Sequence, residues 1–70
     1  MIPLSFANKG EDLVVKKVGG NDEVKRHLEN LGIVPGSSIA VISELNGNLI
    51  VRVKESRIAI NEELAKRIMI

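Results

Sequence analysis

A short amphipathic helix is the clearest element that the hydrophobic pattern predicts. Val24, Leu28 and Leu31 recur at helical spacing, and charged residues occupy most of the other positions of the helical wheel. Asn21 or Asp22 is expected to cap the first turn, because a short side-chain oxygen accepts a hydrogen bond from its free N–H groups. The sequence therefore predicts a helix that packs through one apolar face.

This helix is expected to end at Gly32, because glycine adopts a left-handed closing conformation without steric cost. With Gly32 in that position, Leu28 and Ile33 form the apolar pair that accompanies a Schellman motif. Pro35 cannot continue a helix, and Pro35 and Gly36 together indicate a turn. A helix this short is marginal in water by itself, so it must be held by packing.

Short strands are predicted on both sides of the helix. The predicted strands are Glu11–Val18, Ser38–Glu44, Leu49–Lys54, Arg57–Ile60 and Ile68–Ile70. Asn61 is expected to cap a short helical turn before the last strand. Leu4 and Phe6 are expected in the core, where Phe6, the only aromatic residue, would close one end of the fold.

The loop between the second and third predicted strands determines which side chains share a face. With a three-residue loop that ends at Gly47, Ile39 faces Val53 and Val41 faces Val51. A two-residue Asn-Gly loop shifts the pairing by one residue. Ile39 and Val41 then share a face with the basic residues Arg52 and Lys54. We therefore predict the three-residue loop, with Gly47 left-handed at a bulge.

These elements predict a mainly β fold in one domain, residues 1–70. It is a small barrel with one short α-helix between the first and second main strands and a short helical turn near the C-terminus. The 44% hydrophobic content is mostly aliphatic, and there is no cysteine. No apolar run suits a membrane span, and the first residues do not resemble a signal peptide. We expect a soluble, cytoplasmic protein without direct membrane insertion.

Candidate chemistry is sparse. The chain has one histidine and no cysteine, and its serines have no evident base partner, so we do not expect an enzyme. His27 and Glu23 lie one helical turn apart and are weak candidates for a metal pair, although metal sites require three or four ligands. The glycines from Gly32 to Gly36 follow a helix, whereas a phosphate-binding loop precedes one. We expect no required cofactor; Fe²⁺ binding is possible, but the number of candidate ligands does not support it.

Nucleic-acid binding is a rival hypothesis for a small barrel. Arg52, Lys54 and Arg57 could contribute to a basic face, but the net charge is only +1 and the chain has no Trp or Tyr. Because single-stranded nucleic acids are usually held on aromatic side chains, we do not expect a nucleic-acid partner. Polyproline recognition is disfavoured for the same lack of aromatic residues.

The ordered set of these features resembles the FeoA family. The resemblance runs through Leu4-Ser5, Gly10, Gly19-Gly20, Leu28, Leu31-Gly32-Ile33-Val34-Pro35-Gly36, Ile39, Val41, Val51, Val53, Ile58-Ala59-Ile60, Ala65 and Ile68. It implies an SH3-like barrel and an accessory role in bacterial ferrous iron uptake. Glu55 and Ser56 depart from the family pattern at the turn between the third and fourth strands.

The resemblance also implies a partner, the membrane GTPase-permease FeoB. The predicted docking residues are Arg26, Ile33, Val34 and Arg57, of which Ile33 and Val34 are expected to expose apolar surface. The same fold resembles the C-terminal domain of iron-dependent repressors. A metal-responsive SH3-like module is therefore an alternative, and a small nucleic-acid-binding barrel is a further one.

Overall fold

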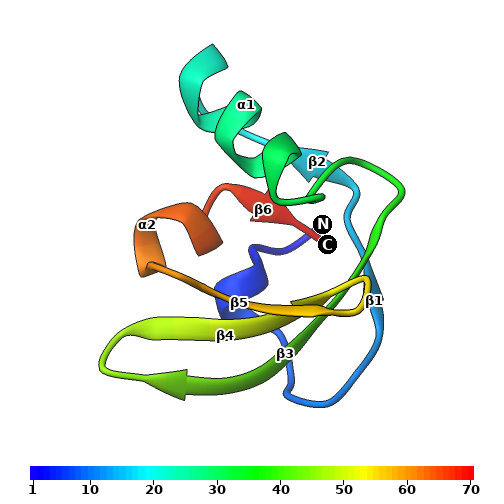
Figure 1. The fold of residues 1–70 in the computed structure, drawn as a ribbon, viewed down its shortest axis with the longest axis vertical. Coiled ribbons are helices and arrows are strands. Elements are labelled where there is room, and N and C mark those ends of the chain that lie inside the picture. Colours follow the sequence, from blue (N-terminus) through cyan, green and yellow to red (C-terminus); the bar gives the residue numbers. More distant parts are fainter.

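Six strands form two antiparallel sheets in the computed structural model, which describes residues 1–70 (Figure 1). The strands are β1 (Leu13–Val14), β2 (Lys17–Val18), β3 (Ser38–Leu45), β4 (Asn48–Val53), β5 (Ser56–Ile60) and β6 (Ile68–Met69). The helical elements are the 3₁₀ turn η1 (Leu4–Phe6) and the helices α1 (Asp22–Asn30) and α2 (Glu62–Ala65). One sheet has the order β1-β3-β4-β5, and the other pairs β2 with β6. The mainly β prediction is confirmed.

The predicted first strand is split between the two sheets. β1 pairs with β3, whereas β2 pairs with β6. Backbone bonding continues through the bend, because Val15 N–H donates to Ser37 O at 2.9 Å and Lys16 N–H donates to Met69 O at 2.7 Å. The prediction of one continuous strand was wrong because the chain bends here to join both sheets and curl the fold.

Helix α1 is capped at both ends as predicted. The Asn21 side chain accepts a hydrogen bond from Val24 N–H at 2.9 Å. At the other end, Ile33 N–H donates to Leu28 O and Gly32 N–H donates to Glu29 O, both at 2.9 Å, with Gly32 at φ +89°. These two bonds are the Schellman motif. Each cap satisfies backbone groups that a helix end leaves free.

The second cap prediction is also confirmed. The side chain of Asn61 accepts a hydrogen bond from Leu64 N–H at 2.8 Å and begins α2. Ala65 of this short helix is buried, and Leu64 packs against the core.

The β3–β4 hairpin has the predicted core register but not the predicted loop. Ile39 pairs with Val53 and Val41 pairs with Val51, as expected. The turn, however, has only two residues, Asn46 (φ +52°) and Gly47 (φ +82°), which is the signature of a type I′ turn. A register shift between Val41 and Ser43 adds the residue that the longer loop was expected to supply.

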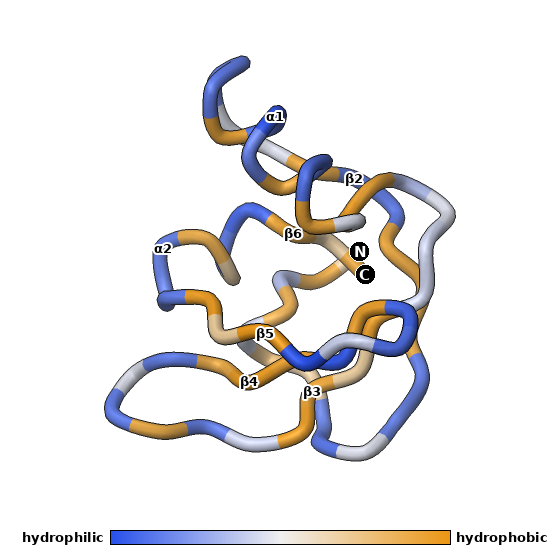
Figure 2. Tube along the Cα trace, in the orientation of Figure 1, coloured by the Kyte–Doolittle hydropathy of each residue, from blue (hydrophilic) through white to orange (hydrophobic).

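The core is entirely aliphatic and lies between the two sheets and the helices. Figure 2 shows hydrophobic stretches along β3, β4, β5 and β6, with hydrophilic residues at most of the turns between the elements. Leu4 is fully buried, as predicted. Phe6 is 74% exposed, so its predicted place in the core was wrong. It ends η1, and the one-turn helix directs Leu4 inward instead.

The two ends of the chain lie side by side (Figure 1). Ile2 N–H donates to Ile70 O at 3.0 Å, and Ile70 N–H donates to Ile2 O at 2.8 Å. A further bridge joins Pro3 to Met69. Neither α-helix has the length and apolar character of a membrane-spanning segment.

Candidate docking surface

The turn that follows α1 exposes one apolar side chain and buries its neighbour. Ile33 is fully buried, so its predicted exposure was wrong. The Schellman motif explains this difference, because the residue after the left-handed glycine folds back against the last helical turn. Val34 is 36% exposed, and it alone of the two presents apolar surface.

Val34 begins a rigid turn. Ser37 N–H donates to Val34 O at 3.0 Å, with Pro35 and Gly36 (φ +92°) in the central positions. Proline followed by a residue of positive φ is the pattern of a type II turn. The Ser37 hydroxyl also donates to Val34 O at 2.7 Å and accepts from Val34 N–H at 3.2 Å.

This turn is also tied to the bend between β1 and β2. Gly36 N–H donates to Val15 O at 2.8 Å, and Val15 N–H donates to Ser37 O at 2.9 Å. The predicted structural roles of Gly32, Pro35 and Gly36 match this geometry. Hydrogen bonds within the turn and to the β1–β2 bend therefore hold the backbone beneath Val34.

A shallow hollow of about 210 Å³ lies beside the turn. Its lining residues are Val18, Lys25, Glu29, Ile33 and Pro35. Apolar atoms form part of the wall, and one basic and one acidic residue of α1 stand at the same opening. Together, this hollow and Val34 form what we call the stop-turn surface.

The exposed face of α1 carries the other predicted residues of the helix. Glu23, Arg26 and His27 line one open surface hollow with Asp22 and Asn30. No group of three or more His, Cys, Asp or Glu side chains is close enough to hold a metal ion. Glu23 and His27 thus share a face without a third ligand, and Arg26 is exposed beside them.

Arg57 lies on the outer face of the sheet, away from α1 in the sequence. It is exposed and pairs across the strands with Arg52. Arg52 donates to Asp12 at 2.9 Å, whereas Arg57 makes no ion pair. Arg57 and the predicted residues of the α1 region do not contact one another directly, but the turns next to them do.

A side chain at Gly32 would lie 3.3 Å from Val53 and 3.7 Å from Lys54. The turn that ends α1 therefore lies against the turn that leads into β5.

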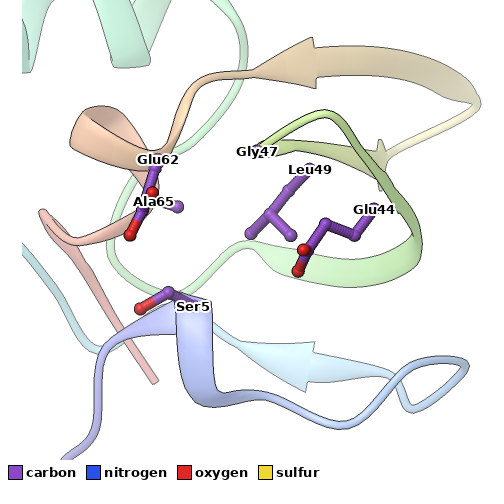
Figure 3. Close-up of a pocket in the computed structure, with 6 residues that line it drawn as sticks. All are labelled: Ser5, Glu44, Gly47, Leu49, Glu62 and Ala65. Carbon is purple, nitrogen blue, oxygen red and sulfur yellow. The ribbon is translucent and has the colours of Figure 1, made fainter.

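A smaller hollow of about 130 Å³ lies between η1, the β3–β4 hairpin and α2 (Figure 3). Leu49 and Ala65 supply its apolar part, and Ser5, Glu44 and Glu62 supply its polar groups. Gly47, which was predicted as a turn residue, completes the lining, and none of the other five residues was among the predicted site residues.

The whole chain matches one protein family. A family model described as the FeoA domain matches residues 2–70. The chain belongs to the FeoA family. It is also 41% identical over 70 residues to the "Putative Fe(2+) transport protein A" of Methanocaldococcus jannaschii, covering 100% of this chain and 85% of that protein.

Solved structures agree with this assignment to FeoA. The FeoA of Stenotrophomonas maltophilia, complexed with zinc and described as a procaryotic SH3 domain protein, has a TM-score of 0.84 and 28% identity. The match covers 99% of this chain and 88% of that one. The predicted SH3-like fold is therefore confirmed. A manganese-dependent transcriptional repressor has a TM-score of 0.83 at 19% identity, over 94% of this chain and 38% of its own, which shows a likeness of fold alone.

In this FeoA chain the predicted docking residues Arg26, Val34 and Arg57 are exposed, whereas Ile33 is buried. The hollow between η1 and α2 was missed because its residues come from distant parts of the sequence. No local pattern links Ser5 to Glu62; only the packing of η1 against α2 does so.

Proposed function

We propose that this chain is a cytoplasmic accessory protein of ferrous iron uptake that docks on the soluble GTPase domain of a FeoB-type permease. Membership of the FeoA family and the likeness to an Fe²⁺ transport protein A support the transport role. The role is one of protein–protein contact rather than catalysis. Ser5, the one hydroxyl residue that lines a hollow, forms no hydrogen bond with the Glu44 or Glu62 carboxylate in that hollow.

The docking proposal rests on Val34, whose exposed apolar side chain is carried by a hydrogen-bonded turn. An exposed apolar side chain contributes little to the stability of the free protein. Here three hydrogen bonds between Val34 and Ser37 hold the backbone beneath it. A contact residue that is already ordered loses little conformational entropy on binding, which favours its use at an interface.

The charges beside the hollow suit a partner with mixed polarity. Lys25 and Glu29 both line the hollow, while Arg26 lies on the adjoining exposed face of α1. Protein–protein interfaces typically have an apolar centre and a polar rim. The stop-turn surface provides both within a few residues.

The test is a calorimetric titration of the full chain into the soluble domain of FeoB, with and without guanine nucleotide. Val34→Asp is expected to weaken binding by about tenfold or more, because charge is placed in the apolar centre. Val14→Asp is the matched control, since Val14 is a 53% exposed valine on β1. It should leave the affinity nearly unchanged.

Two results would contradict the proposal. The first is a wild-type chain that does not bind the FeoB domain in any nucleotide state. The second is equal weakening by both aspartate variants, which would indicate a general charge effect rather than docking through the stop-turn surface. Circular dichroism of each variant before titration checks that the fold is retained.

A further inference from the structure

The outer edge of β5 has no partner strand. β5 is last in the order β1-β3-β4-β5 and pairs only with β4. No backbone hydrogen bond from outside this pair reaches Arg57 or Ala59. An unpaired edge offers a row of free N–H and C=O groups to an incoming strand.

The turn between β4 and β5 determines which groups lie on that edge. Val53 pairs with Ser56 across a two-residue connection, so this is a hydrogen-bonded pair. Hydrogen-bonded and non-hydrogen-bonded pairs alternate along antiparallel strands. Ile58 is therefore bonded to β4, whereas Arg57 and Ala59 direct their N–H and C=O groups outward. This spacing of two residues is what an added antiparallel or parallel strand requires.

The side chain of Arg57 adds an unsatisfied positive charge beside these groups. It lies directly opposite Arg52, and like charges in this position repel each other. Asp12 compensates Arg52 through a contact of 2.9 Å, but no acidic residue of the chain pairs with Arg57. A carboxylate arriving on this face would relieve the repulsion.

The two faces of β5 differ at the same edge. Arg57 and Ala59 are exposed on the outer face, and the small side chain of Ala59 leaves room for a neighbouring strand. Ile58 points to the core side but is only partly buried. A strand added here would place alternate side chains next to the Arg57 charge and next to the uncovered part of Ile58.

We propose that the β5 edge receives an extended segment of a partner protein, with acidic and apolar residues in alternation, as an additional strand. The acidic side chains pair with Arg57, and the apolar ones cover Ile58. This mode of binding takes its affinity from backbone hydrogen bonds and its specificity from alternate side chains. The inference deepens the proposed function, because it states which kind of segment the partner would offer.

The probe is a capped peptide of about eight residues that alternates valine and glutamate, a length typical of one strand. Its binding is followed through the backbone amide signals of the labelled full chain by NMR. The largest shifts are expected at Arg57 and Ala59. A peptide that alternates valine and lysine should bind about tenfold more weakly or not at all.

Two pairs of variants separate backbone pairing from charge. Ala59→Pro removes an outward N–H that the fold does not use, and it should abolish peptide binding while the chain stays folded. Ala59→Val keeps the N–H and should retain binding. Arg57→Glu should weaken binding about tenfold or more, whereas Arg57→Lys keeps the charge and should have a smaller effect.

Several outcomes would overturn the inference. These are no binding of the acidic peptide, shifts centred on Arg26 of α1, equal binding of the lysine peptide, or binding that survives Ala59→Pro. A dimer of the wild-type chain through β5 would instead assign the edge to a second copy of this chain. Self-association of Arg57→Glu would instead show that Arg57 prevents edge-to-edge aggregation.

The same variants distinguish this inference from the proposed function. If the FeoB domain binds wild type and Ala59→Pro equally, docking stands and the β5 edge is not its site. If the acidic peptide binds at β5 but the FeoB domain does not bind at all, the edge is a docking site for a different partner and the proposed function fails.

Discussion

Replacing Gly32 with alanine tests how the end of α1 is joined to the sheet. Gly32 has φ +89°, and a Cβ atom there would lie 3.3 Å from Val53 Cγ1. The side chain of Val53 belongs to the core and is 2% exposed. Two costs therefore add, one from the backbone conformation and one from packing.

The left-handed conformation costs a residue with a Cβ atom about 1–2 kcal/mol. Excess volume against a well-packed side chain costs about 1–3 kcal/mol, and the small gap here places the effect near the lower value. The expected loss in the free energy of unfolding is thus about 2–3 kcal/mol. A chain of this length has a total stability of only about 4–10 kcal/mol, so the effect is large.

Gly36→Ala is the matched control. Gly36 has φ +92°, but nothing lies within 4 Å of a Cβ atom built on it. Only the conformational cost of about 1–2 kcal/mol applies. Urea unfolding followed by far-ultraviolet circular dichroism measures both variants, since the chain has no Trp or Tyr for fluorescence.

A double-mutant cycle with Val53→Ala isolates the contact. Removing the Val53 methyl groups should make Gly32→Ala less costly, with a coupling energy of about 1 kcal/mol. The reasoning is refuted if Gly32→Ala is no more destabilising than Gly36→Ala, or if the cycle shows no coupling.

Four further predictions concern single positions. Lys54 has φ +58°, so Lys54→Gly should be about 1 kcal/mol more stable than Lys54→Ala in urea unfolding; equal stability would exclude backbone strain there. Asn21→Ala should lose about 1 kcal/mol with the helix cap, seen as a lower thermal midpoint, whereas an unchanged midpoint would show that the cap contributes nothing. Phe6→Ser should change the free energy of unfolding by less than about 0.5 kcal/mol, because Phe6 is exposed, and a larger loss would return it to the core. His27→Ala should leave calorimetric titration with Fe²⁺ or Mn²⁺ unchanged, because His27 and Glu23 gather no third ligand; lost binding heat would favour the metal-responsive alternative.

Local features of the fold were predictable from sequence, and features that depend on distant packing were not. The caps at Asn21 and Asn61 and the stop at Gly32 depend on a few neighbouring residues with distinct side-chain chemistry. The core pairing of Val41 with Val51 followed from the hydrophobic pattern. The loop was wrong because a bulge near Ile42 has the same effect on register as one added loop residue.

The candidate surface was predictable to a smaller extent. A sequence pattern identifies Val34 and Ile33 as apolar but does not state which of them the Schellman motif turns inward. The charge on Arg57 was evident, whereas its position at an unpaired edge follows from the order of strands. The pairing partner of each strand is a property of the assembled sheet and is not encoded in any short segment.

The reciprocal bonds between Ile2 and Ile70 have a consequence for protein engineering. Because the two ends already meet, a short peptide linker could close the backbone into a ring without distorting either sheet. The loop-closure model assigns such a ring of roughly 70 residues a gain of about 4 kcal/mol, all of it from restricting the unfolded chain. New ends could then be opened at the exposed Asn46–Gly47 turn, which would give a circular permutant with the same core.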